Sequence, residues 1–280
     1  MTDSTHKSPA RRQWLVDGFD WFVQGYFRRH FHAVALNRDN LRNYSLPQRC
    51  AIVVYGNHCS WWDPLIAILL RKLVFPHFAL YAPIDQDSLA KYRSFSQLGV
   101  YPVKPGTAQG AANFLRKSLA ILDTPGSSLW ITPEGRFCDV RDRSSRLMPG
   151  LGHLANRVQC SRMVAPRNHA VYFIPIAIEL PFWEERLPEC LVRLGAPIEL
   201  EFHSAQPTDK TRWLERLELA LRETQDALAA DSIARDSDRF EILLRGRGGT
   251  WRAYDVLRSL GGWMRGKRVK LNHGNKLSGN

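Results

Sequence analysis

The sequence lacks the marks of several protein classes. Its five cysteines are scattered and form neither a CxxC pair nor a Cys/His cluster with zinc-binding spacing, which argues against a disulfide scaffold and a structural metal site. Its longest apolar runs, such as residues 64–70, are far shorter than the ~20 residues of a membrane-spanning helix. The first twelve residues are polar and lack the apolar core of a signal peptide. We therefore expect reduced thiols, no signal peptide and no transmembrane helix.

Other absences bear on function. No Gly-x-Ser-x-Gly elbow surrounds Ser60, which disfavours a thioesterase or lipase with a serine nucleophile. The chain carries no recognisable RNA- or DNA-binding signature, no internal repeat and no low-complexity tract. A repeat protein is excluded on these grounds, and a dedicated nucleic-acid-binding module is disfavoured.

The chain is rich in basic residues and in apolar residues. There are 39 Lys and Arg against 27 Asp and Glu, a formal net charge of +12, and 44% of the residues are hydrophobic. Such a chain can bury a sizeable core, and its basic surplus favours anionic partners: nucleic acid, acidic lipid head groups or phosphorylated substrates. Charge alone does not choose among them.

Three regions differ in pattern. Residues 1–45 form an N-terminal segment in which residues 13–36 carry aromatic side chains at roughly helical spacing, which predicts an amphipathic helix. This helix either packs on the core or lies at a lipid interface. Residues 46–230 carry the alternating pattern of a domain. Residues 231–280 form a basic C-terminal extension, which is either a solvated tail or a second interfacial element, since residues 251–263 carry apolar side chains near helical spacing.

Strand-like and helix-like segments alternate through the central region. The fold class that this predicts is α/β: a single domain with a largely parallel or mixed sheet flanked by helices. Apolar or β-branched runs predict strands at residues 50–55, 75–82, 100–103, 129–132, 171–178 and 191–194. Helical spacing predicts helices at residues 63–73, 107–122, 151–158 and 212–230.

The sharpest local signal is residues 57–63, NHCSWWD, at a strand-to-helix junction. Two residues five apart on one helix diverge by about 140°, so His58 and Asp63 can meet only if His58 lies in the turn and Asp63 in the first helical turn. Asp63 would then accept the proton of one imidazole nitrogen and leave the other nitrogen as a base. The alternative is that Asp63 merely caps its helix.

Two further segments follow predicted strands. In ITPEGRF at residues 131–137, Gly135 lets the backbone approach a ligand, Arg136 offers a planar fork for a phosphate, and Glu134 could bond an acceptor hydroxyl or orient Arg136. In LGVYPVK at residues 98–104, a strand delivers Lys104 to its end. The alternative for the first segment is an ordinary turn with a surface Glu–Arg pair.

Taken with the strand YFIPIAI at residues 172–178, these blocks resemble the glycerolipid (lysophosphatidate-type, PlsC-like) acyltransferase family. That family is marked by an Asn-His-x4-Asp block, a Gly-led strand ending in Arg, a Pro-Glu-Gly block with Arg, and a Val/Ile-Pro-φ-Ala strand. The second block here ends in Lys104 in place of Arg, and in the third Arg136 follows Gly135 directly. Both departures concern acceptor recognition, so the head group of the acceptor is left open.

The resemblance implies an O-acyltransferase of phospholipid biosynthesis. His58 would be the general base and Asp63 the residue that orients it. The substrate-binding residues would be Asn57, Lys104, Glu134, Gly135 and Arg136. The implied partners are an acyl thioester donor (acyl-CoA or acyl carrier protein), a lipid acceptor and an anionic membrane surface, with no metal, no bound cofactor and no nucleic acid.

We accordingly expect a peripheral protein on the cytoplasmic face of the cell membrane. The alternative is a non-catalytic basic protein that binds acidic lipid surfaces or nucleic acid, for which the net charge is the argument.

Overall fold

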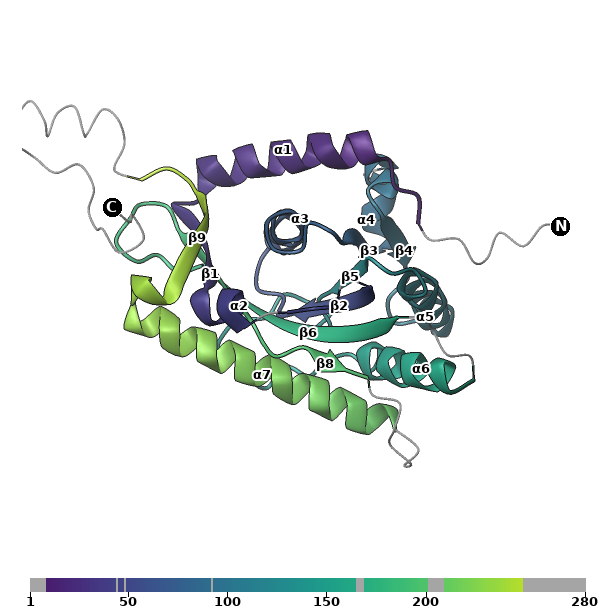
Figure 1. The fold of residues 1–280 in the computed structure, drawn as a ribbon. Coiled ribbons are helices and arrows are strands. Elements are labelled where there is room, and N and C mark those ends of the chain that lie inside the picture. The colour runs from purple at the N-terminus through teal and green to yellow at the C-terminus, as the bar shows by residue number, and fades with distance from the viewer. Residues whose placement is uncertain are drawn as a thin grey trace, which may run out of the picture.

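The chain forms a single α/β structure around one mixed sheet (Figure 1). The computed structural model describes residues 9–43, 45–47, 49–91, 93–164, 169–200 and 209–248. Within them a nine-stranded sheet has the strand order β4-β3-β5-β2-β6-β7-β1-β9, and β8 pairs with β6 outside this path. This confirms the predicted fold class.

The sheet contains a parallel half and a mixed half. The strands are β1 (Ala33–Asn37), β2 (Cys50–Gly56), β3 (Ala79–Asp85), β4 (Val100–Val103), β5 (Ser127–Ile131), β6 (Ala170–Glu179), β7 (Glu189–Leu194), β8 (Ile198–Glu199) and β9 (Phe240–Arg245). Strands β4, β3, β5, β2 and β6 run parallel, whereas β7 and β8 pair antiparallel with β6. Strand β1 is parallel to β7 and antiparallel to β9.

Helices cover both faces of the sheet. They are α1 (Gln13–His30), α2 (Arg38–Asn43), α3 (Asp63–Leu73), α4 (Gln86–Lys91), α5 (Ala108–Leu122), α6 (Gly150–Val164) and α7 (Lys210–Ala234), with 3-10 turns at Arg93–Gln97 and Ser237–Arg239. In Figure 1, α1 and α3 lie above the central strands, and α6 and α7 lie below them.

Strand β2 shows why the sheet needs both layers. Each of its residues is buried, and successive side chains point to opposite faces of a strand. Ile52 and Val54 join the apolar cluster with α1 and α3, whereas Val53 and Tyr55 join the cluster with α5, α6 and α7. An uninterrupted apolar run is therefore what this central parallel strand requires.

The predicted elements of the central region are confirmed within a few residues, and helix α3 has the predicted bounds. One strand begins later than predicted, at Ala79 instead of Phe75, because residues 75–78 form a turn in which the Phe78 N–H donates to the Phe75 carbonyl. Pro76 lies within that turn and has no N–H for a sheet.

The predicted helix over residues 13–36 is wrong in its last part. The helix ends at His30, and Ala33–Asn37 form β1 between β7 and β9. All five residues of β1 are buried, which an amphipathic surface helix could not provide.

The division of the chain at residues 45/46 and 230/231 stays a prediction. Nevertheless β1 and β9, which lie outside the predicted acyltransferase domain, pair within its sheet. The apolar residues 251–263 of the C-terminal extension lie outside the described residues.

The parallel strands bring the predicted functional segments to one edge of the sheet. The carboxyl ends of β2, β4 and β5 lead into the residues that follow them: His58, Lys104 and Glu134. Carboxyl ends of strands in open α/β sheets are the usual place for a ligand.

Candidate active site

The turn between β2 and α3 places His58 against Asp63. The His58 Nδ1 lies 2.7 Å from Asp63 Oδ2. Asp63 is the first residue of α3 and Pro64 follows it, so the strand–turn–helix geometry that the spacing predicts is present. An ionised carboxylate only accepts hydrogen bonds, so Nδ1 carries the proton and Nε2 is the basic nitrogen. The His58 side chain is 20% exposed.

Asp63 is itself held in place. Its Oδ2 also accepts the backbone N–H of Ser60 at 3.0 Å, and the side chain is almost fully buried. Because the carboxylate is fixed by the same turn that carries His58, the imidazole has little rotational freedom. Asp63 therefore does more than cap its helix.

Asn57 precedes the histidine and is bound to the end of β6. Its amide Nδ2 donates to the Ile178 carbonyl at 3.0 Å, and its Oδ1 accepts the Ile178 N–H at 2.9 Å. The residue is buried, and both ends of its amide are used by the end of β6. The structure thus gives Asn57 a role in fixing the His58 turn, and its part in substrate binding stays a prediction.

Glu134 has an equally structural setting. Its Oε2 accepts the backbone N–H of His58 at 2.7 Å, and its Oε1 accepts from Arg222 Nη1 at 3.2 Å. The side chain is buried between these two partners. The sequence predicts a surface residue or an acceptor ligand here, whereas the structure shows a bridge between the His58 turn and α7.

Gly135 and the loop after it close over the histidine. Gly135 has φ +66, a left-handed conformation that favours glycine, and a Cβ there would lie 2.4 Å from Met148 Sδ, so the Met148 side chain would have to shift. Further along, the Cys138 N–H donates to the His58 carbonyl at 2.8 Å, and the exposed Phe137 ring lies 4.4 Å from the imidazole, centroid to centroid. An aromatic ring thus covers part of the imidazole.

The two predicted acceptor cations lie at the same edge but apart from the pair. Arg136 and Lys104 are both exposed, and within the described residues neither side chain forms an ion pair or hydrogen bond with His58 or Asp63. Lys104 follows β4, three strand positions from β2, which corresponds to about 14 Å across the sheet. A ligand that contacts both Lys104 and His58 must therefore be extended.

Sequence analysis missed two groups around the site. Arg222 on α7 binds Glu134, and Trp62, next to Asp63, packs against four rings of the α1 region: Tyr26, Phe27, His30 and Phe31. No local pattern marks Arg222, since its partner is 88 residues away. The tryptophan could have been suspected, because it lies within the NHCSWWD block.

Cys59 is not set up as a nucleophile, although it neighbours the histidine. Burial first, and the nearby Asp63 carboxylate second, raise the pKa of its thiol well above the ordinary value. The thiolate that a nucleophilic cysteine needs is therefore suppressed. All five cysteines are free thiols in the structure. In the described part of the chain no cluster of His, Cys, Asp and Glu could hold a metal ion.

A histidine held by a carboxylate thus lies at the carboxyl edge of a mixed α/β sheet, an arrangement that can serve as a general base toward a hydroxyl or water. A family model described as Acyltransferase matches residues 36–179. This is more than half of the chain, and the chain belongs to the acyltransferase family. The predicted resemblance is thereby confirmed at the level of the family.

Comparisons with individual proteins are less specific than the match to the family model. None of the curated proteins compared with the chain matches it. Among solved structures, the chain is similar to PlsC, the 1-acyl-sn-glycerophosphate (LPA) acyltransferase from Thermotoga maritima, with 12% sequence identity and a TM-score of 0.46. That likeness covers 78% of this chain and 81% of the other.

Proposed function

We propose that this acyltransferase moves a fatty acyl group from acyl-CoA or acyl carrier protein to a hydroxyl of a glycerolipid or related lipid acceptor, with His58 as the general base and Asp63 as the residue that orients it. The observation that carries the proposal is the 2.7 Å contact between His58 Nδ1 and Asp63 Oδ2, which leaves Nε2 as the base. Membership of the acyltransferase family favours this enzyme over a purely binding protein.

The chemistry needs no covalent enzyme intermediate. His58 Nε2 takes the proton of the acceptor hydroxyl, and the oxygen attacks the thioester carbonyl carbon. This attack forms the new C–O bond and gives a tetrahedral intermediate, whose collapse restores the carbonyl and breaks the C–S bond. The imidazolium then returns its proton to the departing thiolate. Asp63 stabilises the imidazolium while it exists, as the carboxylate of a Ser-His-Asp triad does.

The exposed side chains near His58 at the sheet edge favour one class of acceptor. The exposed Phe137 ring offers an apolar contact beside the base, and the exposed cations Arg136 and Lys104 suit an anionic group farther away. This combination fits an amphipathic acceptor whose hydroxyl lies between an acyl chain and a charged head group.

The test is a product assay with a panel of acceptors. The purified protein, liposomes and a long-chain acyl-CoA or acyl carrier protein are incubated with lysophosphatidate, other lysophospholipids or neutral hydroxylated lipids, and mass spectrometry follows the products. We expect an acylated product from an amphipathic acceptor with one of the two donors. Failure of every acceptor with both donors, by a folded protein, would contradict the proposal.

Attachment to a membrane surface is a separate part of the proposal. Among the described residues no helix combines the length and apolar character needed to cross a bilayer. However, Trp14 and Trp21 on α1 are 67% and 80% exposed, and α1 ends in Arg28 and Arg29. Tryptophan beside basic residues suits the interface of an anionic bilayer.

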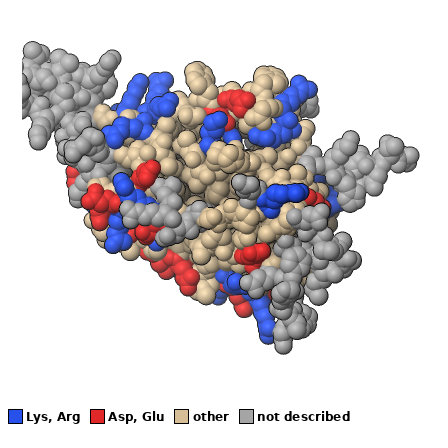
Figure 2. Space-filling model, in the orientation of Figure 1, with Lys and Arg blue, Asp and Glu red and all other residues tan. Residues whose placement is uncertain are grey.

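Figures 1 and 2 show how this surface is arranged. Helix α1 forms the upper edge of the molecule, and Lys and Arg side chains gather at both ends of that edge, with uncharged surface and an acidic patch between them. Trp14 and Trp21 are seven residues apart and hence lie on the same side of the helix. We propose that this side of α1 contacts the membrane.

Replacing both Trp14 and Trp21 with alanine should weaken binding to anionic phospholipid vesicles by about tenfold or more, because each removes a large apolar side chain from the interface. Vesicle flotation measures the effect. The matched control is Leu219→Ala with Ile233→Ala, which removes two comparably exposed apolar side chains from α7 on the opposite side of the sheet. Equal loss in both variants, or none in the tryptophan variant, would refute the assignment to α1.

A further inference from the structure

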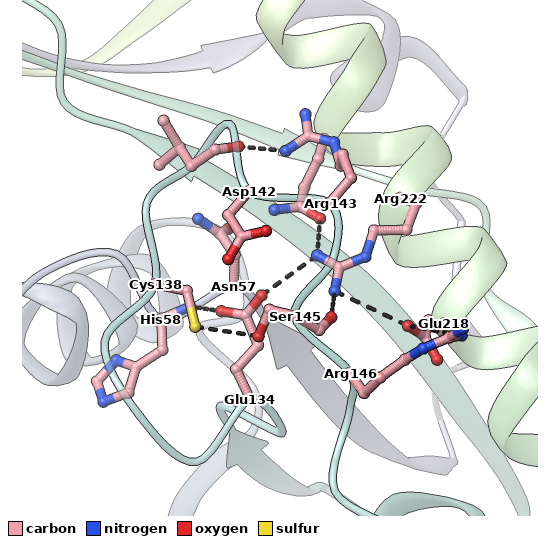
Figure 3. A network of polar contacts seen from close by, with 12 residues as sticks. Asn57, His58, Glu134, Cys138, Asp142, Arg143, Ser145, Arg146, Glu218 and Arg222 are labelled. Atoms are coloured by element: carbon pink, nitrogen blue, oxygen red, sulfur yellow. Dashed lines mark hydrogen bonds and ion pairs between the residues drawn. The ribbon is translucent and has the colours of Figure 1, made fainter.

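Behind the His58 turn lies a polar network that reaches α7 (Figure 3). The Glu134 carboxylate bridges two elements: one oxygen accepts the His58 N–H at 2.7 Å, and the other accepts from Arg222 Nη1 at 3.2 Å. Figure 3 shows the imidazole on one side of Glu134 and the Arg222 guanidinium on the other. The two charged side chains are largely buried, so this is an ion pair with little access to water.

Arg222 ties three segments together. Its Nη1 also donates to Gln225 Oε1 at 2.8 Å on α7, and its Nη2 donates to the Ser145 carbonyl in the loop before α6. The Glu218 carboxylate lies 3.9 Å from Nη2. A planar guanidinium with several donors can satisfy these partners at once, which the single ammonium of lysine cannot do.

The other contacts that hold the His58 turn within the described residues do not reach α7. Asp63 holds the ring, Cys138 binds the carbonyl, and Asn57 fastens the preceding residue to β6. Glu134 alone binds the backbone N–H of the histidine, and an ionised carboxylate is a stronger acceptor than a neutral one. The cation that binds the other oxygen of Glu134 therefore bears on where the base lies.

We propose that Arg222 is a positioning residue for the base His58 and acts through Glu134. This inference rests on the proposed function, in which His58 takes the proton of the acceptor. It extends the working part of the chain to α7, beyond residues 36–179 that the family model matches. The Nη1 and Nη2 groups of Arg222 donate to Glu134, Gln225 and Ser145, so we expect it to act through these partners and not by binding the acceptor.

The kinetic test separates positioning from substrate binding. Arg222→Gln should lower kcat by about 10- to 100-fold, because an ångström of misplacement of a catalytic group can cost 10²-fold, and should leave the KM values for donor and acceptor unchanged. Arg222→Lys retains the charge, and its kcat should lie between those of the wild type and Arg222→Gln. The control is Arg212→Gln, which removes an exposed arginine from the same helix and should leave kcat unchanged.

A double variant tests whether Arg222 acts through Glu134. If it does, Glu134→Gln combined with Arg222→Gln should be no slower than the slower single variant, since both break the same connection. Losses that multiply, or a rise in the acceptor KM with kcat preserved, would overturn the proposal. If Arg222→Gln does not fold, Arg222→Lys takes its place in the single and the double variant.

Hydrogen exchange makes the result independent of the proposed reaction. Arg222→Gln should speed the exchange of peptides that contain the His58 and Cys138 amides by roughly tenfold, and Arg212→Gln should not. If the wild-type protein transfers no acyl group but Arg222→Gln still exchanges faster than the wild type, the proposed function is refuted. The positioning role of Arg222 then stands. Unchanged exchange at His58 would overturn the positioning role, whether or not acyl transfer occurs.

Discussion

Alanine in place of His58 is expected to slow acyl transfer by about 10²–10⁴-fold, the usual contribution of a positioned general base. The reason lies in the geometry: Asp63 fixes Nδ1–H, so Nε2 is the only basic nitrogen that the turn presents. The acceptor hydroxyl would have to be deprotonated by water in the variant. Product formation at saturating donor and acceptor, followed by mass spectrometry, measures the loss.

The matched control is His77→Ala. His77 is an exposed histidine in the loop before β3, at the opposite edge of the parallel strands from His58. The His77→Ala variant should transfer acyl groups at the wild-type rate, and circular dichroism should show that the His77 and His58 variants are both folded. If the His58 variant keeps more than about a tenth of the wild-type rate, the base lies elsewhere and the proposed mechanism fails.

The local geometry of the site is what the sequence predicts well. The apolar run of β2, the turn after Gly56 and the proline early in α3 all lie within one stretch of chain, and together they define where His58 and Asp63 lie. Each of these signals depends only on neighbouring residues. For this reason the geometry of the pair could be derived before the structure was known.

Contacts between distant segments are what the sequence does not predict. The sequence places Glu134 in the acceptor pocket, and its neighbours give no sign that it binds the His58 N–H and Arg222. A carboxylate that is buried in the fold looks the same in sequence as one that faces solvent. The contact between Asn57 and Ile178 is equally hidden, since the two residues lie 121 positions apart.

The ends of the sheet illustrate the same limit for the fold. Strand β1 continues directly from the aromatic run of α1, which hides its start, and β9 is a short run within a basic stretch whose flanking residues, Ser237 and Gly246, are the only local sign of it. They become strands because each covers an exposed edge, β1 on β7 and β9 on β1. Such pairing is decided by the assembled sheet and leaves little trace in the local pattern.

The second large effect concerns stability, at the buried ion pair between α1 and α3. Arg71 Nη2 lies 2.5 Å from each Asp20 carboxylate oxygen, and both residues are buried beside the apolar cluster that joins these helices to β2. Removing one partner leaves the other charge buried without compensation. Asp20→Ala is therefore expected to lower the free energy of unfolding by about 3–5 kcal/mol.

Urea denaturation followed by circular dichroism measures this change, and a paired replacement separates charge from packing. Asp20→Leu with Arg71→Met fills similar volume with apolar side chains and should leave the stability near the wild-type value or raise it by about 1–4 kcal/mol. A loss as large in the paired variant as in Asp20→Ala would show that the geometry of the pair, and not the unpaired charge, is what stabilises α1. A loss below about 1 kcal/mol in Asp20→Ala would mean that water reaches Arg71.

The paired variant also tests whether α1 supports the active site. Trp62 adjoins Asp63, and the rings of Tyr26, Phe27 and His30 on α1 pack against it. If α1 keeps its place through apolar packing, the paired variant should retain the wild-type kcat. If kcat falls while the unfolding free energy does not, the ion pair sets the register of α1 over Trp62, and the outer helix that we propose to contact the membrane would then be mechanically connected to the orientation of the base.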